Sequence, residues 1–289
     1  MRIDFDSETP IYIQIAEEME DAILSGAFPE ESQVPSTTEI SATYRINPAT
    51  VLKGMALPLL TFPFGLLGSL AVLLMPEITQ AHVLGQTARL NALLDRMLRL
   101  TGFFSALAAA LFWCWGPDAA GLLYGSAEAG FYLQVLAPVL PLLYLESMVD
   151  GAMKGVGEQK AAFRYSVWDA VLRLAGVAVL LPRYGMRGFL AVMLLSTLYT
   201  CAANTGRLLF SSGMPHAFRR WLGAPALAGA LAAAAGTGLR QALALPLAGD
   251  LWPRLAALGA GGCATAGVFL LAAWPLGLGE ELARMRGTI

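Results

Sequence analysis

The sequence predicts an all-α fold: a polytopic transmembrane helix bundle of about seven spans, preceded by a small helix-turn-helix segment. Of the 289 residues, 56% are hydrophobic and only 14% are charged, whereas a soluble domain normally carries about 25% charged residues. The charge is uneven, because residues 1–53 hold three basic and ten acidic residues, whereas the remainder holds 16 basic and 11 acidic ones. Apolar stretches of about 20 residues, the length that crosses a bilayer, begin only after residue 54. These observations divide the chain into segments 1–54 and 55–289.

Segment 1–54 has the pattern of three short helices. Residues 10–26 carry apolar side chains at helical spacing and finish on a glycine. Ser36 and Glu39 form a capping-box pattern that opens a second helix. Asn47 is a helix-capping residue, and Pro48 suits the first position of a third helix. Two helices joined by a tight turn are typical of a helix-turn-helix.

The longer segment is predicted to cross the membrane seven times, over residues 55–76, 98–116, 131–150, 165–182, 187–206, 222–240 and 253–275. Small residues recur every four positions in the last two spans, and that spacing lets helix backbones approach closely. They are Gly229 and Ala233 in one span and Gly259, Cys263 and Gly267 in the other. We therefore expect a packed bundle rather than isolated anchors.

Loop charge predicts the orientation of the spans. The loops and tail on one side carry eleven Lys and Arg residues, and the opposite side carries five. This places the C-terminus in the cytoplasm and the residue before Met55 outside. Residues 82–98 alternate apolar and charged side chains and are expected to form an amphipathic helix at the cytoplasmic interface.

Ionisable residues inside the spans are the candidate functional residues, because a charge at mid-bilayer costs roughly 2.5–3.5 kcal/mol on insertion scales. Asp169 and Arg173 lie four residues apart and share a helix face. They either contact a sugar or pyrophosphate headgroup from a cavity or form a structural ion pair. Glu146 and Asp150 have the same spacing and suggest either ion coupling or two carboxylates that reach interfacial water.

Two further polar residues close the fifth predicted span. Asn204 and Arg207 complete the candidate substrate or ion pathway, although the Arg207 side chain could instead extend to the lipid headgroups. We find no nucleophile motif, phosphate-binding loop or zinc-ligand spacing. The three cysteines lie in apolar runs and suit packing. The sequence therefore predicts no enzymatic activity, cofactor or metal site.

Three stretches in the longer segment carry a family resemblance: residues 56–79, 150–160 and 182–188. They resemble, in order, parts of the stage V sporulation protein B-like polysaccharide-biosynthesis flippases of the MOP superfamily, which also includes the MATE exporters. The resemblance implies a transporter of a polyprenyl-linked sugar or another lipid-linked oligosaccharide, acting by alternating access in the bacterial cytoplasmic membrane. It also implies that the spans form the second of two lobes, so a first lobe or a second copy is an expected partner.

Four shorter stretches near the N-terminus resemble the GntR family of helix-turn-helix repressors: residues 10–15, 24–28, 34–39 and 46–51. This resemblance implies DNA contacts by Ser36, Asn47 and Thr50, with Lys53 as a further phosphate contact. A membrane-anchored transcriptional regulator is therefore an alternative function. Loop charge places residue 54 outside the cell, however, whereas a DNA reader acts inside. A non-functional gene fusion is the third interpretation.

Overall fold

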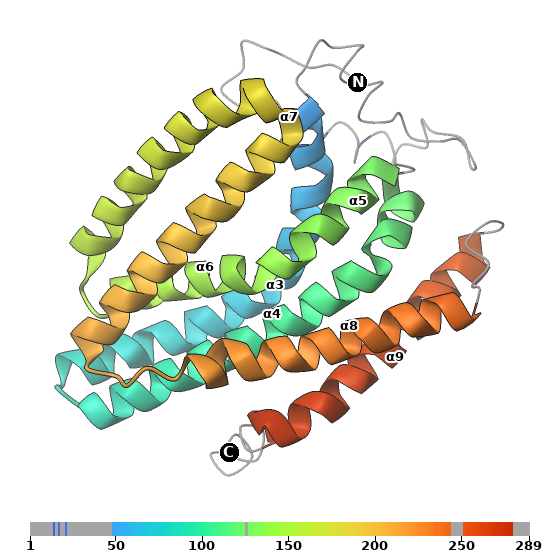
Figure 1. Cartoon of the computed structure of the whole chain (residues 1–289). Coiled ribbons are helices and arrows are strands. Elements are labelled where there is room, and N and C mark those ends of the chain that lie inside the picture. The colour runs from blue at the N-terminus through green and yellow to red at the C-terminus, as the bar shows by residue number, and fades with distance from the viewer. Residues whose placement is uncertain are drawn as a thin grey trace.

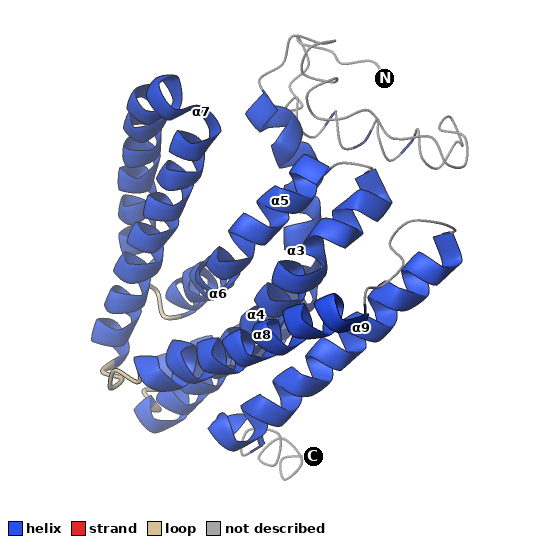
Figure 2. Ribbon diagram, turned by 45° about the vertical axis from the view of Figure 1, so that its right-hand side comes forward, coloured by secondary structure: helices blue, strands red, loops and turns tan. Residues whose placement is uncertain are grey.

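The computed structural model describes residues 48–124, 127–243 and 251–279, together with Gln14, Glu17 and Asp21. All described elements are helices, which confirms the predicted all-α class (Figure 1, Figure 2). Six of the helices are long and apolar enough to cross a membrane, and a bent pair makes up to seven. The predicted helix-turn-helix residues Ser36 and Asn47 lie outside the described residues.

The first span belongs to α3 (Pro48–Val83), which begins at the predicted proline and continues through residues 54 and 55 without a break. Thr50 and Lys53 lie in this helix, but their side chains are outside the described part. The span consists of Leu59–Ser69 and Leu73–Val83, which are bent by 49° relative to each other. Pro76 has no N–H to donate to the carbonyl of residue 72, so the bend coincides with a missing helical hydrogen bond.

The second span is α4 (Thr87–Tyr124), and it corrects the expectation of a separate interfacial helix over 82–98. A turn with Gly85 at φ 67° follows α3, and one uninterrupted helix then starts at Thr87. One face of its first turns is buried, with Leu94, Met97 and Leu98 fully covered. Their apolar face packs against α3 and α6 within the same hydrophobic core. Because no proline or glycine interrupts this stretch before residue 102, the helix runs on into the span.

The third span combines α5 (Ala127–Leu136), the single turn η1 (Ala137–Val139) and α6 (Leu140–Gly155). Pro138 and Pro141 lie at the change from one helix to the next. The fourth and fifth spans form α7 (Gln159–Ser212), which is a hairpin rather than a single rod. Gly185 reverses the chain with φ 54° and ψ −135°, a conformation suited to glycine. We call Gln159–Gly185 the first arm and Arg187–Ser212 the second arm.

The last two spans consist of η2 (Arg219–Gly223) with α8 (Ala224–Leu243), and α9 (Leu251–Ala273) with η3 (Trp274–Leu278). The helix α4 lies at the centre of the bundle, where it packs against α3, α5, α6, α8 and α9. The α7 hairpin stands on one side of the bundle and α9 on the opposite side (Figure 1, Figure 2). The first predicted span overlaps the bent α3, and each of the other six lies within one of the candidate spans of the structure.

Of the two predicted small-residue stripes, one forms a helix contact and the other does not. A Cβ added at Gly229 would lie 3.1 Å from the carbonyl oxygen of Ala106, so this glycine lets α8 approach α4 closely. Gly259 and Gly267 have nothing within 4 Å of such an atom, and Cys263 is exposed. The face of α9 that contacts α4 instead carries Gly261 and Thr265. Gly261 lies against the Trp115 ring, and Thr265 accepts a hydrogen bond from the indole N–H.

The closest helix contact gives a test of this packing. A Cβ on Gly102 would lie 2.0 Å from the carbonyl oxygen of Trp221. We expect Gly102→Ala to separate α4 from η2, to destabilise the protein by about 1–3 kcal/mol and to lower its melting temperature in detergent. Gly259→Ala, which meets open space, is the matched control and should leave that temperature nearly unchanged. Equal melting temperatures for the two variants would show that these helices do not pack as described.

Candidate functional site

A polar cluster lies between the two arms of the α7 hairpin. Asp169 on the first arm accepts a 2.9 Å hydrogen bond from Nη2 of Arg173, as the four-residue spacing predicted. Ser196 on the second arm donates its hydroxyl to the other carboxylate oxygen of Asp169. The same hydroxyl oxygen accepts from Nη2 and Nε of Arg173, at 2.7 and 3.2 Å. Three side chains thus form one closed network across the hairpin.

The local sequence explains why the arms meet here. Gly176 faces Val192, whose Cγ2 would lie 2.9 Å from an added Cβ, so the lack of a side chain lets the arms approach. Ser196 and Thr200 lie four residues apart on the second arm and therefore share a face. Sequence reasoning overlooked both residues, although their four-residue spacing matches that of Asp169 and Arg173 on the preceding span.

The cluster is buried on the carboxylate side and open on the guanidinium side. Asp169 is 8% exposed and Ser196 is fully buried, whereas the Arg173 side chain is 54% exposed. The first arm contributes little other burial, since only 6% of its most apolar window is covered. An arginine in a span avoids hydrocarbon when it is paired or when it faces protein or water. The open side of Arg173 therefore marks a surface that is not suited to lipid alone.

Glu146 of α6 adds a second carboxylate to the cluster. It lies next to the hydroxyl of Thr200 and is close enough to Asp169 and Arg173 to experience their charges. The Thr200 hydroxyl also donates to the carbonyl of Ser196 at 3.1 Å. Two carboxyl groups and one guanidinium from α6 and the first arm therefore lie beside two hydroxyls of the second arm, an arrangement suited to holding a cation or a polar headgroup.

The other predicted pathway residues lie toward the helix ends, with Asp150 close enough to Glu146 for their charges to interact. Asp150 forms an ion pair with Lys154 at 2.7 Å, one helical turn toward the end of α6. Arg207 forms a bidentate pair with Glu158, with bonds of 3.0 and 2.8 Å. That pair joins the start of the first arm to the end of the second, so it closes the base of the hairpin.

Asn204 lies between the cluster and the base of the hairpin. It continues the four-residue series of Ser196 and Thr200 along the second arm. Its side chain is 4% exposed, and its Oδ1 has no hydrogen-bond partner among the described residues. A buried acceptor of this kind normally has a donor, a water molecule or an ion beside it. The second arm thus carries a polar stripe from the cluster toward the Glu158–Arg207 pair.

The buried carboxylate provides a stability test of the cluster. Arg173→Gln leaves Asp169 with the Ser196 hydroxyl alone, so we expect a loss of roughly 1–3 kcal/mol and a lower melting temperature in detergent. The double variant D169N/R173Q removes the unpaired charge and should recover part of the loss. As a control, Lys154→Gln breaks an exposed pair and should change little. A double variant less stable than R173Q would contradict the assigned pairing.

The chain is similar in sequence to two known proteins. No protein-family model matches the chain, and no solved structure matches it. It is 26% identical over 175 residues to sporulation protein YkvU of Bacillus subtilis (strain 168), an alignment that covers 60% of this chain and 37% of that protein. It is also 26% identical over 132 residues to stage V sporulation protein B of the same organism, covering 46% and 26% of the two chains. The chain thus spans well under half the length of either relative. With its apolar helices, the chain is a multi-pass membrane protein that resembles these sporulation proteins.

Proposed function

We propose that this chain is a membrane transport protein of the polysaccharide or lipid-linked-oligosaccharide flippase type, which works by alternating access. The observation that carries the proposal is the polar cluster of Glu146, Asp169 and Arg173 inside apolar spans. Maintaining such groups in a membrane is costly, and they lie in an arrangement that can bind a polar ligand. Midplane polar sites between helices are where transporters hold substrate and coupling ions.

The chemistry of the cluster suits a phosphorylated sugar lipid. The Arg173 guanidinium has an exposed side, and this group binds phosphate oxygens with paired hydrogen bonds. The carboxyl groups of Glu146 and Asp169 can accept sugar hydroxyls or hold a coupling cation. The polar stripe through Thr200 and Asn204 would lead toward the cytoplasmic base of the hairpin.

The proposal includes a second bundle that faces the α7 hairpin. The first arm is barely covered and exposes Phe163, Trp168 and Leu174 together with the open side of Arg173. A cavity between two lobes would shield that arginine from lipid and let water or headgroups reach it. A first lobe on another chain, or a second copy of this chain, would supply the opposing wall.

The two relatives support the same assignment. The sequence resemblance to stage V sporulation protein B-like flippases rests on three ordered stretches, and the alignments to YkvU and stage V sporulation protein B agree with it. We further propose that the chain lies in the bacterial cytoplasmic membrane with its C-terminus inside, as the loop charges predict.

The transport proposal is tested in proteoliposomes with a fluorescent polyprenyl-diphosphate sugar whose outer-leaflet pool is quenched chemically. We expect the full chain to move the probe between leaflets. Glu146→Gln and Asp169→Asn should each slow that movement about tenfold or more, because each removes a hydrogen bond to a charged group. Glu77→Gln is the matched control, since Glu77 lies half-exposed outside the cluster. A wild-type chain that moves no probe, alone or at densities where copies meet, would contradict transport by this chain or by its homo-oligomer.

The orientation is tested by cysteine labelling in intact cells, after the native cysteines have been replaced. We expect a cysteine placed at Gly185, in the turn of the hairpin, to react with a membrane-impermeant maleimide. A cysteine at Gly213, at the other end of the second arm, should react only after the cells are opened. The reverse pattern would place the C-terminus outside and contradict the positive-inside assignment.

A further inference from the structure

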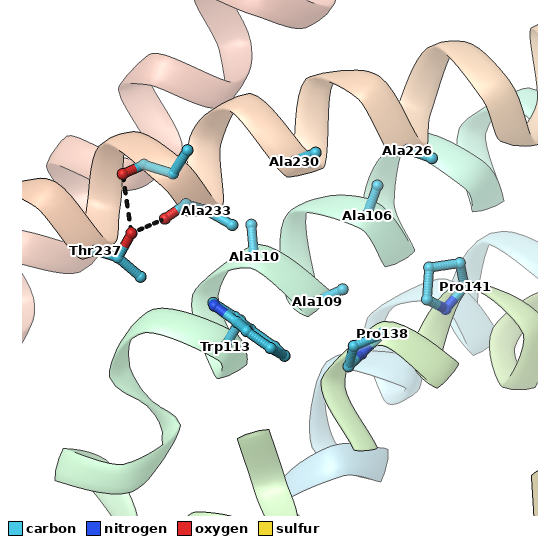
Figure 3. A pocket seen from close by; sticks show the side chains of 12 residues that line it. Ala106, Ala109, Ala110, Trp113, Pro138, Pro141, Ala226, Ala230, Ala233 and Thr237 are labelled. Atoms are coloured by element: carbon cyan, nitrogen blue, oxygen red, sulfur yellow. Dashed lines mark hydrogen bonds between the residues drawn. The ribbon is translucent and has the colours of Figure 1, made fainter. Parts of the chain in front are cut away.

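A cavity of about 500 Å³ lies away from the polar cluster, along the contact between α4 and α8 and beside η1 and the start of α6. Figure 3 shows Ala109 and Trp113 of α4, Ala230 and Thr237 of α8, and Pro138 and Pro141 around it. Its volume is in the range of small-molecule sites, roughly 300–1,000 Å³. Ala230 is exposed and Trp113 is 39% exposed, so the cavity is a groove that opens outward.

The lining of this groove is almost entirely apolar. It consists of alanine, glycine and proline with one tryptophan, and its one hydroxyl belongs to Thr237. That hydroxyl is already bonded to the carbonyls of Ala233 and Ala234, each at 2.9 Å (Figure 3). Water needs two to four polar partners to occupy a cavity, and the groove walls do not offer them. Because α4, α6 and α8 are candidate membrane spans, the acyl chains of the surrounding lipids are the apolar groups available to fill the groove.

A charged pair follows the groove on both helices, about one turn beyond the last lining residues Thr237 and Trp113. Arg240, three residues after Thr237 on α8, donates from Nη2 to Oδ1 of Asp118 on α4 at 2.8 Å. The ion pair therefore bridges the two helices that line the groove. The Asp118 side chain is 9% exposed, and its Oδ2 is buried without a hydrogen-bond partner within the described ranges, so the accessible polar group of the pair is the guanidinium. The Arg240 side chain is 33% exposed, and a guanidinium has five N–H donors.

We infer that this groove holds one acyl chain of an anionic phospholipid, with its headgroup against Arg240. The phosphate would accept from the exposed donors of Arg240 that do not bond to Asp118. The polar headgroup and the apolar acyl chain of such a lipid thus each meet a matching group. The site is separate from the polar cluster on α7 and does not depend on transport.

A helix from a second copy is the rival occupant, since Ala226, Ala230 and Ala234 form a small-residue series on α8. Size argues against it. A helix with side chains is about 10 Å across, so three turns of it occupy roughly 1,300 Å³. That volume exceeds the empty space in the groove and its mouth, which is about 960 Å³. An acyl chain is narrow enough to enter, and it leaves Arg240 accessible to a headgroup.

The test is a lipid titration of the full chain in detergent, followed by native mass spectrometry. The probes are phosphatidylglycerol and phosphatidylcholine with identical oleoyl chains. We expect phosphatidylglycerol to bind about tenfold more tightly, as one charge-assisted contact predicts. Ala230→Phe fills the groove and should abolish binding of both lipids, whereas Ala235→Phe on the exposed face of α8 should not. Ala109→Leu fills the groove from α4 and provides the same test if A230F does not fold.

The headgroup contact is tested separately. D118N/R240Q removes both charges together and should erase the tenfold preference without abolishing binding, whereas Arg240→Lys should retain most of it. Equal affinity of the wild-type chain for the two lipids would overturn the headgroup assignment. Undiminished lipid binding by both groove-filling variants would overturn the assignment of the groove as the lipid site. A species of twice the mass that A230F removes would show that a second copy occupies the groove.

Discussion

Charges in a membrane need partners, and that requirement organises this structure. Asp169 and Arg173 share Ser196, Asp118 holds Arg240, and Glu158 holds Arg207 with two bonds. Ser196 connects the Asp169–Arg173 pair to the other arm, and the other two pairs join residues that are distant in the chain, so these networks also fix how the helices are placed. In water such pairs add little to stability. In hydrocarbon an unpaired member costs several kcal/mol, so the pairing becomes a condition for folding.

Charged side chains of α4, at the centre of the bundle, are paired in the same way. Asp95 accepts from the Arg99 guanidinium and, at 2.8 Å, from the indole of Trp221. One turn further, Gly102 allows the backbone of η2 to lie against α4. A charged network and a glycine contact thus act together, because the network orients η2 and the glycine removes the side chain that would hold it away. Near the other end of α4, Trp115 bonds to Thr265 at 3.0 Å and anchors α9.

The fold separates two kinds of surface. Polar groups gather between α6 and the arms of α7, where the first arm is nearly uncovered by the rest of the chain. Apolar small residues gather between α4 and α8, where they leave a groove. Both surfaces border α6, whose first turn contacts the groove and whose middle contributes Glu146. A movement of α6 against α4 would therefore change both surfaces together, which links a lipid-facing groove to a polar site within one bundle.

The sequence by itself determined the membrane character, the helical class and the positions of the spans, because hydrophobic length decides these properties locally. It also identified the Asp169–Arg173 pair, since four-residue spacing is a property of one helix. It did not reveal Ser196, Glu158 or Trp221 as partners, and it separated the first turns of α4 from the span to which they belong. The small-residue stripe Gly259, Cys263 and Gly267 also does not form the helix contact of α9, because small residues allow such a contact without requiring it. Which side chains pair between helices depends on how distant segments of the chain pack. Only the tertiary structure decides that packing, because the burial of each side chain depends on all the helices around it.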